Sequence, residues 1–138
     1  MDHLTHINPA MLANSLAAGY SQVIVANSGK QVFLAGQVGW DVNGALAGDG
    51  SFAAQAAKAL DNVRIALDEA GASGEDIVHI KYFVVGCNEG RVSELSTAIR
   101  EAAIFNFEHP PTGTLLGVEC LARDNLLIEI EAIAVIPT

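Results

Sequence analysis

The alternation of side chains near the C-terminus, in NLLIEIEAIAV (residues 125–135), predicts a β-strand with two different faces. One face is purely apolar and should cover a core; its members are Ile128, Ile130, Ala132 and Ala134. The other face carries Glu129 and Glu131 among aliphatic residues. Burying a carboxylate costs free energy unless it is paired or hydrogen-bonded. We therefore expect the acidic face to meet a surface that holds clefts or water.

Five more strands and two helices are predicted by the remaining patterns. β-rich runs cover residues 21–27 and 31–38, and the SGK between them favours a hairpin, with glycine supplying the positive φ of the turn. Strands are also expected at residues 76–86 and 112–120, and a short one at residues 3–8. A glycine-rich loop over residues 42–50 separates the second β-rich run from the first helix.

The two helices are indicated by apolar residues that recur every three or four positions. In residues 51–71 these are Phe52, Ala56, Leu60, Val63 and Leu67, and Gly71 stands where a C-terminal cap belongs. In residues 91–105 they are Val92, Leu95, Ile99, Ala102 and Ala103. The HPP that follows should end the second helix, because proline cannot continue one.

The resulting order, β-β-β-α-β-α-β-β, predicts one α+β domain over residues 1–138. Two helices can cover only one face of such a sheet. A sheet this apolar must also bury its other face, the one with the two glutamates. We expect further copies of the chain to cover it, since closed symmetric oligomers are the usual solution.

Charge and composition restrict the partners and the compartment. Seven basic against sixteen acidic residues leave a net charge of −9, which repels nucleic acid and anionic membranes. No apolar run reaches the roughly 18 residues of a membrane span, and the start lacks the pattern of a signal peptide. Two cysteines are too few for a disulfide framework, so a cytoplasmic protein is expected. No metal site or cofactor is indicated.

Six stretches in a specific order give the chain a resemblance to a known family. They are AAGYSQVIVAN, VFLAGQVGWD, AAQAAKALDNVRIALDEAGAS, DIVHIKYFVV, HPPTGTLLGVECLA and LIEIEAIAV. Together they resemble the RidA (reactive intermediate deaminase) family, also called YjgF, over essentially the whole length. The resemblance implies a chorismate-mutase-like α+β fold, a homotrimer with ligand clefts between subunits, and hydrolysis of reactive enamines and imines to a keto acid and ammonia.

The resemblance also assigns roles to single residues. Tyr20 matches the family's cleft tyrosine, and Gly36 and Gln37 match the glycine and glutamine of its S-G-Q motif, in which Ala35 replaces the serine. Glu129 matches the glutamate that holds the attacking water. From the pattern alone, Glu129 either acts as an acid or base in the cleft or accepts hydrogen bonds across a subunit seam. For Glu131 we favour the structural role.

One departure from the family changes the expected substrate. Deaminating members read P-A-R-S where this chain reads PPTGTLLGVE, so Gly113 or Thr114 replaces the arginine that binds the substrate carboxylate, and Leu115 follows. A bidentate arginine is hard to replace there. We therefore expect an imine or enamine deaminase with an atypical small-molecule substrate. The alternative is a non-catalytic trimer that binds a small metabolite; a ribonuclease or translation inhibitor is disfavoured by the charge.

Overall fold

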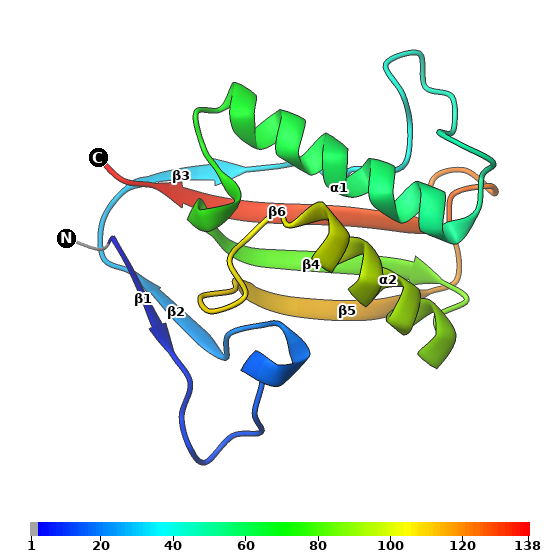
Figure 1. Cartoon of the computed structure of the whole chain (residues 1–138). Coiled ribbons are helices and arrows are strands. Elements are labelled where there is room, and N and C mark those ends of the chain that lie inside the picture. The colour runs from blue at the N-terminus through cyan, green and yellow to red at the C-terminus, as the bar shows by residue number, and fades with distance from the viewer. Residues whose placement is uncertain (1–2) are drawn as a thin grey trace.

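A computed structural model describes residues 3–138, and the elements follow the predicted order (Figure 1). The strands of the described part are β1 (Leu4–Ile7), β2 (Val23–Ala26), β3 (Lys30–Phe33), β4 (Ile77–Val85), β5 (Thr112–Val118) and β6 (Ile128–Ile136). The helices are α1 (Phe52–Glu69) and α2 (Glu89–Ala102), with short 3-10 turns η1 (Leu16–Ala18) and η2 (Gly74–Asp76). The α+β assignment is confirmed.

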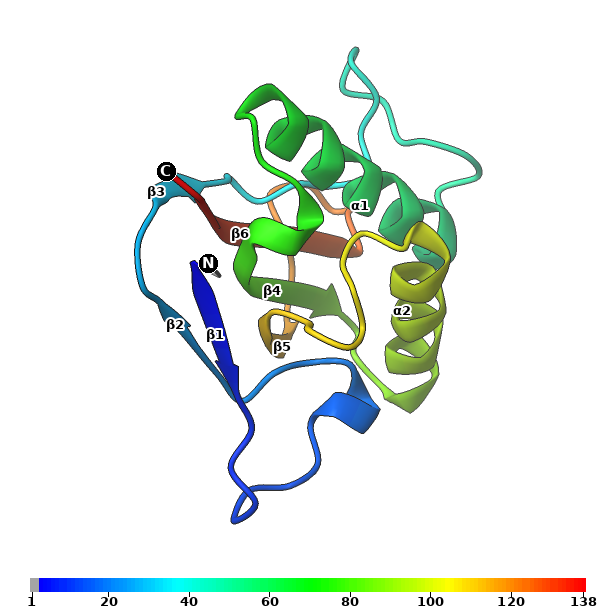
Figure 2. The same cartoon turned by 60° about the vertical axis from the view of Figure 1, so that its left-hand side comes forward.

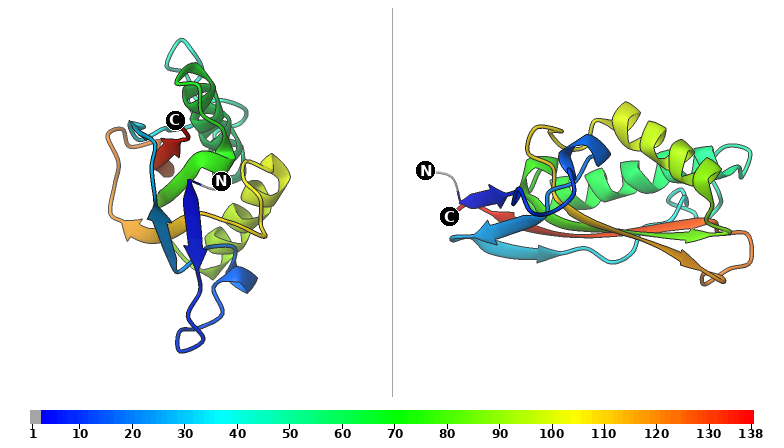
Figure 3. Two further views of the ribbon diagram at one scale, coloured as in Figure 1. Left: turned by 90° about the vertical axis from the view of Figure 1, so that its left-hand side faces the viewer. Right: turned by 90° about the horizontal axis from the view of Figure 1, so that it is seen from below.

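Four strands form the main sheet, in the order β3-β6-β4-β5. Strand β6 is antiparallel to both β3 and β4, while β4 and β5 are parallel. A parallel connection needs a crossover, and α1 and α2 supply the two crossovers, from β3 to β4 and from β4 to β5. Seen edge-on, both helices lie on the same side of the sheet and no helix lies on the other (Figure 3, right). The prediction that helices cover one face only is confirmed.

The predicted hairpin between residues 21–27 and 31–38 is wrong. Strand β2 pairs with β1 in a separate two-stranded sheet, and β3 pairs with β6. Gly29 does adopt a positive φ, of 132°, but it packs against the backbone of Ile136 instead of folding one strand back on the other. The SGK turn changes the direction of the chain, but it does not decide which strands pair. Strand β2 pairs with β1, and β3 pairs with β6.

Small side chains on α1 let the helix approach the sheet closely. Ala56, Ala59, Leu60 and Val63 are fully buried, as the period of the sequence predicted for three of them. They face the apolar side of β6, where Ile128, Ile130, Ala132 and Ala134 are at most 2% exposed. This contact supplies the main hydrophobic driving force of the fold. Because β6 also carries Glu129, the same contact fixes the strand that presents the carboxylate.

The second helix differs from its prediction at its C-terminal end. It stops at Ala102, where Ala103 takes a left-handed conformation with φ 48°, seven residues before the first proline of HPP. The buried stripe is Leu95 and Ala98, with Ile99 partly buried, while Val92 is 39% exposed. The prolines therefore do not end this helix. Val92 is left beside an open hollow that is described below.

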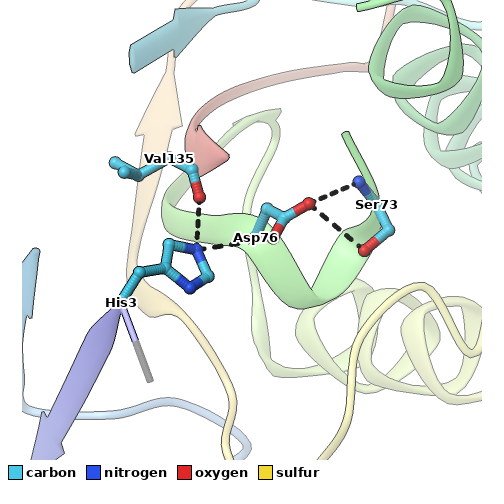
Figure 4. Close-up of polar contacts among 4 residues, drawn as sticks. All are labelled: His3, Ser73, Asp76 and Val135. Carbon is cyan, nitrogen blue, oxygen red and sulfur yellow. Dashed lines mark hydrogen bonds and ion pairs between the residues drawn. The ribbon is translucent and has the colours of Figure 1, made fainter. Parts of the chain in front are cut away.

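His3, the first described residue, contacts the C-terminal end of β6 and the 3-10 turn η2 (Figure 4). His3 Nε2 lies 2.6 Å from the carbonyl oxygen of Val135 and 3.5 Å from a carboxylate oxygen of Asp76. The other carboxylate oxygen of Asp76 accepts hydrogen bonds from the backbone N–H and the hydroxyl of Ser73, which caps η2.

None of the helices within residues 3–138 is long and apolar enough to cross a membrane.

A buried glutamine fixes the start of β6. Gln55 on α1 is fully buried, and its amide nitrogen donates to the carbonyl oxygens of Gly50 and Asn125 at 3.0 and 2.9 Å. Its amide oxygen accepts the N–H of Leu127 at 2.9 Å. One side chain thus satisfies three backbone groups, two of them directly before β6. Gly39 packs on the same residue, because a Cβ there would lie 2.8 Å from Gln55 Cα.

We expect Gln55→Leu to lower the free energy of unfolding by about 3 kcal/mol or more. The leucine removes three hydrogen bonds to partly buried backbone groups, at roughly 1 kcal/mol for each. Urea unfolding followed by circular dichroism measures the change. The matched control is Gln22→Leu, because the amide of Gln22 makes one exposed hydrogen bond to Ala13 and its loss should cost less than about 1 kcal/mol. Equal losses in the two variants would contradict this role of Gln55.

Candidate functional site

The side of the main sheet that faces away from the helices, which we call the open face, carries both predicted acids. Strand register and side-chain alternation place the following residues on it: Phe33, Lys81, Phe83, Thr114, Leu116, Glu129, Glu131 and Ile133. Phe33 is 68% exposed and Leu116 is 41% exposed. Apolar side chains that are this exposed on an unpartnered sheet are typical of an interaction surface.

Glu129 lies directly over Gly36. A Cβ added at Gly36 would be 2.2 Å from Glu129 Oε2 and 2.7 Å from its carboxylate carbon, distances at which atoms overlap. Only glycine therefore lets the half-buried carboxylate occupy this place. The carboxylate of Glu129 is therefore in contact with the backbone of Gly36.

The segment after Gly36 is held by backbone and side-chain hydrogen bonds. Gln37 exchanges two backbone hydrogen bonds with Ile130, of 2.7 and 2.9 Å, so it continues the β3–β6 pairing beyond Ala35 and Gly36. The amide of Gln37 donates to the carbonyl oxygen of Ala35 at 3.2 Å. From α1, the amide of Asn62 donates to the carbonyl oxygens of Val38 and Trp40. The backbone around the carboxylate is thereby fixed from both sides.

A hollow of about 500 Å³ opens beside Glu129. Its lining includes Gly36, Gln37, Trp40, Lys58, Asn62 and Glu129. This volume lies within the range of small-molecule sites, about 300–1,000 Å³. The lysine is already engaged, because its ammonium group lies 3.2 Å from the carboxylate of Asp61 one helical turn away. The carboxylate of Glu129 has no ion pair among the described residues, so it is available to a ligand or a water molecule.

The other predicted site residues lie elsewhere in the same chain. Tyr20, Gly113, Thr114 and Leu115 line a second hollow, of about 300 Å³, next to α2 and β5. Strands β3 and β5 are the two edges of the main sheet, about 14 Å apart, and Glu129 on β6 is two strand spacings, about 10 Å, from β5. The chain therefore brings Ala35, Gly36, Gln37 and Glu129 together but keeps them apart from Tyr20 and the β5 residues.

Register distinguishes the two positions that replace the family arginine. Thr114 pairs with Lys81 and lies on the open face, whereas Gly113 pairs with the buried Ile80 and faces the helices. Only a side chain at position 114 would share a face with Glu129. We therefore expect the missing arginine to matter at position 114.

One cation on the open face was missed in the sequence. Lys81 lies between Thr114 and Glu131 in the same cross-strand row, and its ammonium group is 3.8 Å from Glu131. The pair is about 40% exposed on both sides, so we expect it to contribute little stability. The alternation in DIVHIKYFVV already placed Lys81 opposite the buried Ile80, but the strand order that puts it beside Thr114 has no sequence signal.

A histidine borders this row. The Nδ1 atom of His79 lies 2.7 Å from the hydroxyl of Thr112. Burial lowers the pKa of His79, and the charge of Lys81 lowers it further, while Glu131 opposes the shift. We therefore expect His79 to be neutral at pH 7, which leaves Lys81 as the positive charge of this part of the open face.

Comparisons with known proteins agree with this architecture. A family model described as endoribonuclease L-PSP matches residues 12–136. A RutC family protein from Synechocystis is 31% identical over 121 residues, which are 86% of this chain and 87% of the relative. A 2-iminobutanoate/2-iminopropanoate deaminase from the mite Dermatophagoides farinae is 30% identical over 118 residues, 85% of each chain.

A solved structure of similar shape comes from Yersinia pestis, a protein of unknown function in the conserved Rid family. It has a TM-score of 0.88 and 32% sequence identity, and the match covers 98% of this chain and 100% of that one. The family model and the relatives together span both hollows and the open face. The chain therefore belongs to the endoribonuclease L-PSP family, the YjgF or Rid family to which its motifs pointed.

Proposed function

We propose that the chain hydrolyses small reactive imines or enamines whose carbon skeleton lacks the usual carboxylate. The observation that carries the proposal is the Glu129 carboxylate above Gly36, free of ion pairs within the described residues and open to a hollow. Such a carboxylate can hold a water molecule and take its proton during attack on the C=N carbon. A relative of 30% identity carries the name of an imine deaminase.

Assembly of several copies would complete the site. Glu129 and Gly36 lie near one edge of the main sheet, whereas Tyr20 and Thr114 lie near the other. In a closed ring of copies, one edge of each sheet meets the opposite edge of the next. The Glu129 group of one copy would then face the Tyr20 and Thr114 group of its neighbour. The exposed Phe33 and Leu116 would become buried between them.

We expect the protein to run as a trimer, with three times the chain mass of 14.4 kDa. The apolar open face has no cover within one chain, and burying it between copies is favourable. Light scattering after size-exclusion chromatography at micromolar concentration measures the mass. A stably folded monomer would contradict both the trimer and the shared cleft.

Charge favours a substrate without a carboxylate. The net charge of −9 repels imino acids and attracts protonated imines, which are cations. The hollow beside Thr114 has no charged residue in its lining. Glu129 would then meet the positive iminium carbon without a competing anion on the substrate.

The direct test uses an imine that a flavin amine oxidase generates from benzylamine in the assay mixture. We expect the protein to speed the appearance of benzaldehyde and ammonia above the spontaneous rate, in proportion to its concentration. Heat-denatured protein is the control. If native protein binds such imines or the product aldehyde but leaves the rate unchanged, the second candidate, a metabolite-binding protein without turnover, replaces the first. The apolar lining beside Leu115 is what favours that candidate.

A further inference from the structure

A hollow of about 410 Å³ lies where the N-terminal strand β1, the turn η2 and the segment between α2 and β5 meet (Figure 2). Three of the four histidines of the chain border it, together with two carboxylates and an amide: His3, His6, His109, Glu75, Asp76 and Asn106. No lysine or arginine of the described residues lines it. A hollow rich in imidazole, with negative charge at its rim, favours a cation that takes nitrogen ligands.

The ring of His6 is held in one orientation by a buried serine. Its Nδ1 atom lies 3.1 Å from the hydroxyl oxygen of Ser21, which is 1% exposed. That hydroxyl donates its only proton to the carbonyl oxygen of Pro110, so it can only accept a hydrogen bond from His6. Nδ1 of His6 therefore carries the ring proton, and Nε2 keeps a lone pair. Metal-binding histidines are commonly oriented in this way, by a hydrogen bond at the nitrogen that does not bind the ion.

The ring of His109 lies next to that of His6. The two ring centroids are 5.6 Å apart, and the ring planes are inclined at 55°. Two imidazoles bound to one tetrahedral zinc ion have centroids about 5 Å apart, because each Zn–N bond is about 2.0–2.1 Å long. The rings are thus close to the separation at which one ion joins them. Burial lowers the pKa of His6 and the adjacent His109 lowers it further, so at pH 7 His6 is neutral, as metal binding requires.

The backbone that carries the two histidines is held by further hydrogen bonds. The N–H of Ser21 donates to the carbonyl oxygen of Pro111 at 2.9 Å, which ties the start of β2 to the segment before β5. The side chain of Asn106 accepts the N–H of Glu108 at 2.8 Å, and its carbonyl oxygen accepts the N–H of His109 at 3.1 Å. The separation of the two rings is therefore set by the fold.

We propose that His6 and His109 form a site for a divalent transition-metal ion of the zinc type, bound through Nε2 of His6 and a ring nitrogen of His109. Among residues 3–138 no three His, Cys, Asp or Glu side chains are close enough to hold an ion together, so water or a small ligand fills the remaining positions. His3 is directed elsewhere, because its Nε2 donates to the carbonyl oxygen of Val135. The ion joins β1 to the segment before β5 and so stabilises the attachment of the two-stranded sheet.

The test is a calorimetric titration of the assembled protein with Zn²⁺ at pH 7.5. We expect one ion to bind per chain. His6→Gln and His109→Gln should each weaken binding at least about tenfold, since each removes one of the two protein ligands. His79→Gln is the matched control, because His79 is the one histidine that does not line the hollow, and its affinity should be unchanged. Absence of binding, or equal affinity in the wild type and the two ligand variants, would overturn the proposal.

A second arm separates the site from the acidic surface, because the sixteen Asp and Glu side chains also attract Zn²⁺. Mg²⁺ prefers oxygen ligands and should not compete with Zn²⁺, whereas Cu²⁺ should bind more tightly than Zn²⁺. The electron paramagnetic resonance spectrum of the Cu²⁺ complex should show coupling to two imidazole nitrogens, and to one in His109→Gln. Competition by Mg²⁺, or a spectrum without nitrogen coupling, would mean that surface carboxylates alone bind the ion.

Thermal unfolding gives a readout that does not depend on the heat of binding. An ion that binds only the folded chain raises its stability, so at about a hundred times the dissociation constant we expect the wild-type midpoint to rise by about 4 °C or more. His109 is exposed, so His109→Gln should fold normally and show no such rise, even if His6→Gln does not fold. An equal rise in the wild type and His109→Gln would show that Zn²⁺ acts elsewhere and would reject the site.

Discussion

With 2-iminopropionate as substrate, we expect keto-acid release to be accelerated about ten- to a hundredfold less than by an arginine-bearing relative. A charge-assisted hydrogen bond to a carboxylate contributes roughly 1.5–3 kcal/mol, which corresponds to this loss in rate. Of the two positions that could replace the arginine, Thr114 is the one on the open face, and it carries no charge. The imine can be generated by an amino-acid oxidase acting on alanine, and pyruvate is then followed by a coupled assay.

Arginine should restore this activity at one position only. Thr114→Arg places a guanidinium on the open face, which Glu129 shares, so we expect a gain of about tenfold or more. Gly113→Arg is the matched control, since it adds the same charge one residue away but on the helix side. If only Gly113→Arg gained activity, the substrate carboxylate would bind on the helix side, and the assignment of Thr114 to the cleft would be wrong.

Fast wild-type turnover of 2-iminopropionate would have a specific explanation. Lys81 lies beside Thr114 in the same row, and its ion pair with Glu131 is long, at 3.8 Å. Lys81→Met would then remove the activity. If Lys81→Met left a fast reaction unchanged, no cation of this row would hold the carboxylate, and the assignment of the cleft would be wrong.

Local patterns predicted most of the fold. The alternation around Glu129 and the helical period from Phe52 to Leu67 gave the correct elements and buried faces, because burial imposes those periods directly. The partner of β2 and the end of α2 were wrong. Each depends on contacts with distant residues: β2 pairs with β1, and the carbonyl oxygen of Ala102 at the end of α2 accepts a hydrogen bond from Arg64 of α1.

The candidate site was predictable only in part. The sequence singled out Glu129 and Gly36, and the structure adds that the two touch. It could not have shown which of Gly113 and Thr114 shares a face with Glu129, because alternation puts neighbours on opposite faces and only the strand pairing decides which face meets the helices. Lys81 was also out of reach. Its importance comes from the strand order, which leaves no local pattern in the sequence.

Glu129→Gln should lower kcat/KM for imine hydrolysis by about a hundredfold or more, while the fold and the trimer remain. General acid–base catalysis by a positioned side chain is worth about 10²–10⁴-fold, and an amide cannot take the proton of the attacking water. Glutamine has the shape of glutamate, so its contact with Gly36 persists. Initial rates with the benzylamine-derived imine, and light scattering of the same samples, measure both properties.

Glu131→Gln is the matched control on the same strand and face. Glu131 is two residues from Glu129, but its carboxylate pairs with Lys81 and is 42% exposed. Removing that charge should change the stability by less than about 1 kcal/mol and leave the imine reaction nearly as fast. If neither variant formed a trimer, both carboxylates would serve to stabilise the contact between copies. If only Glu129→Gln lost activity, with its trimer intact, Glu129 would be the group that acts on the water.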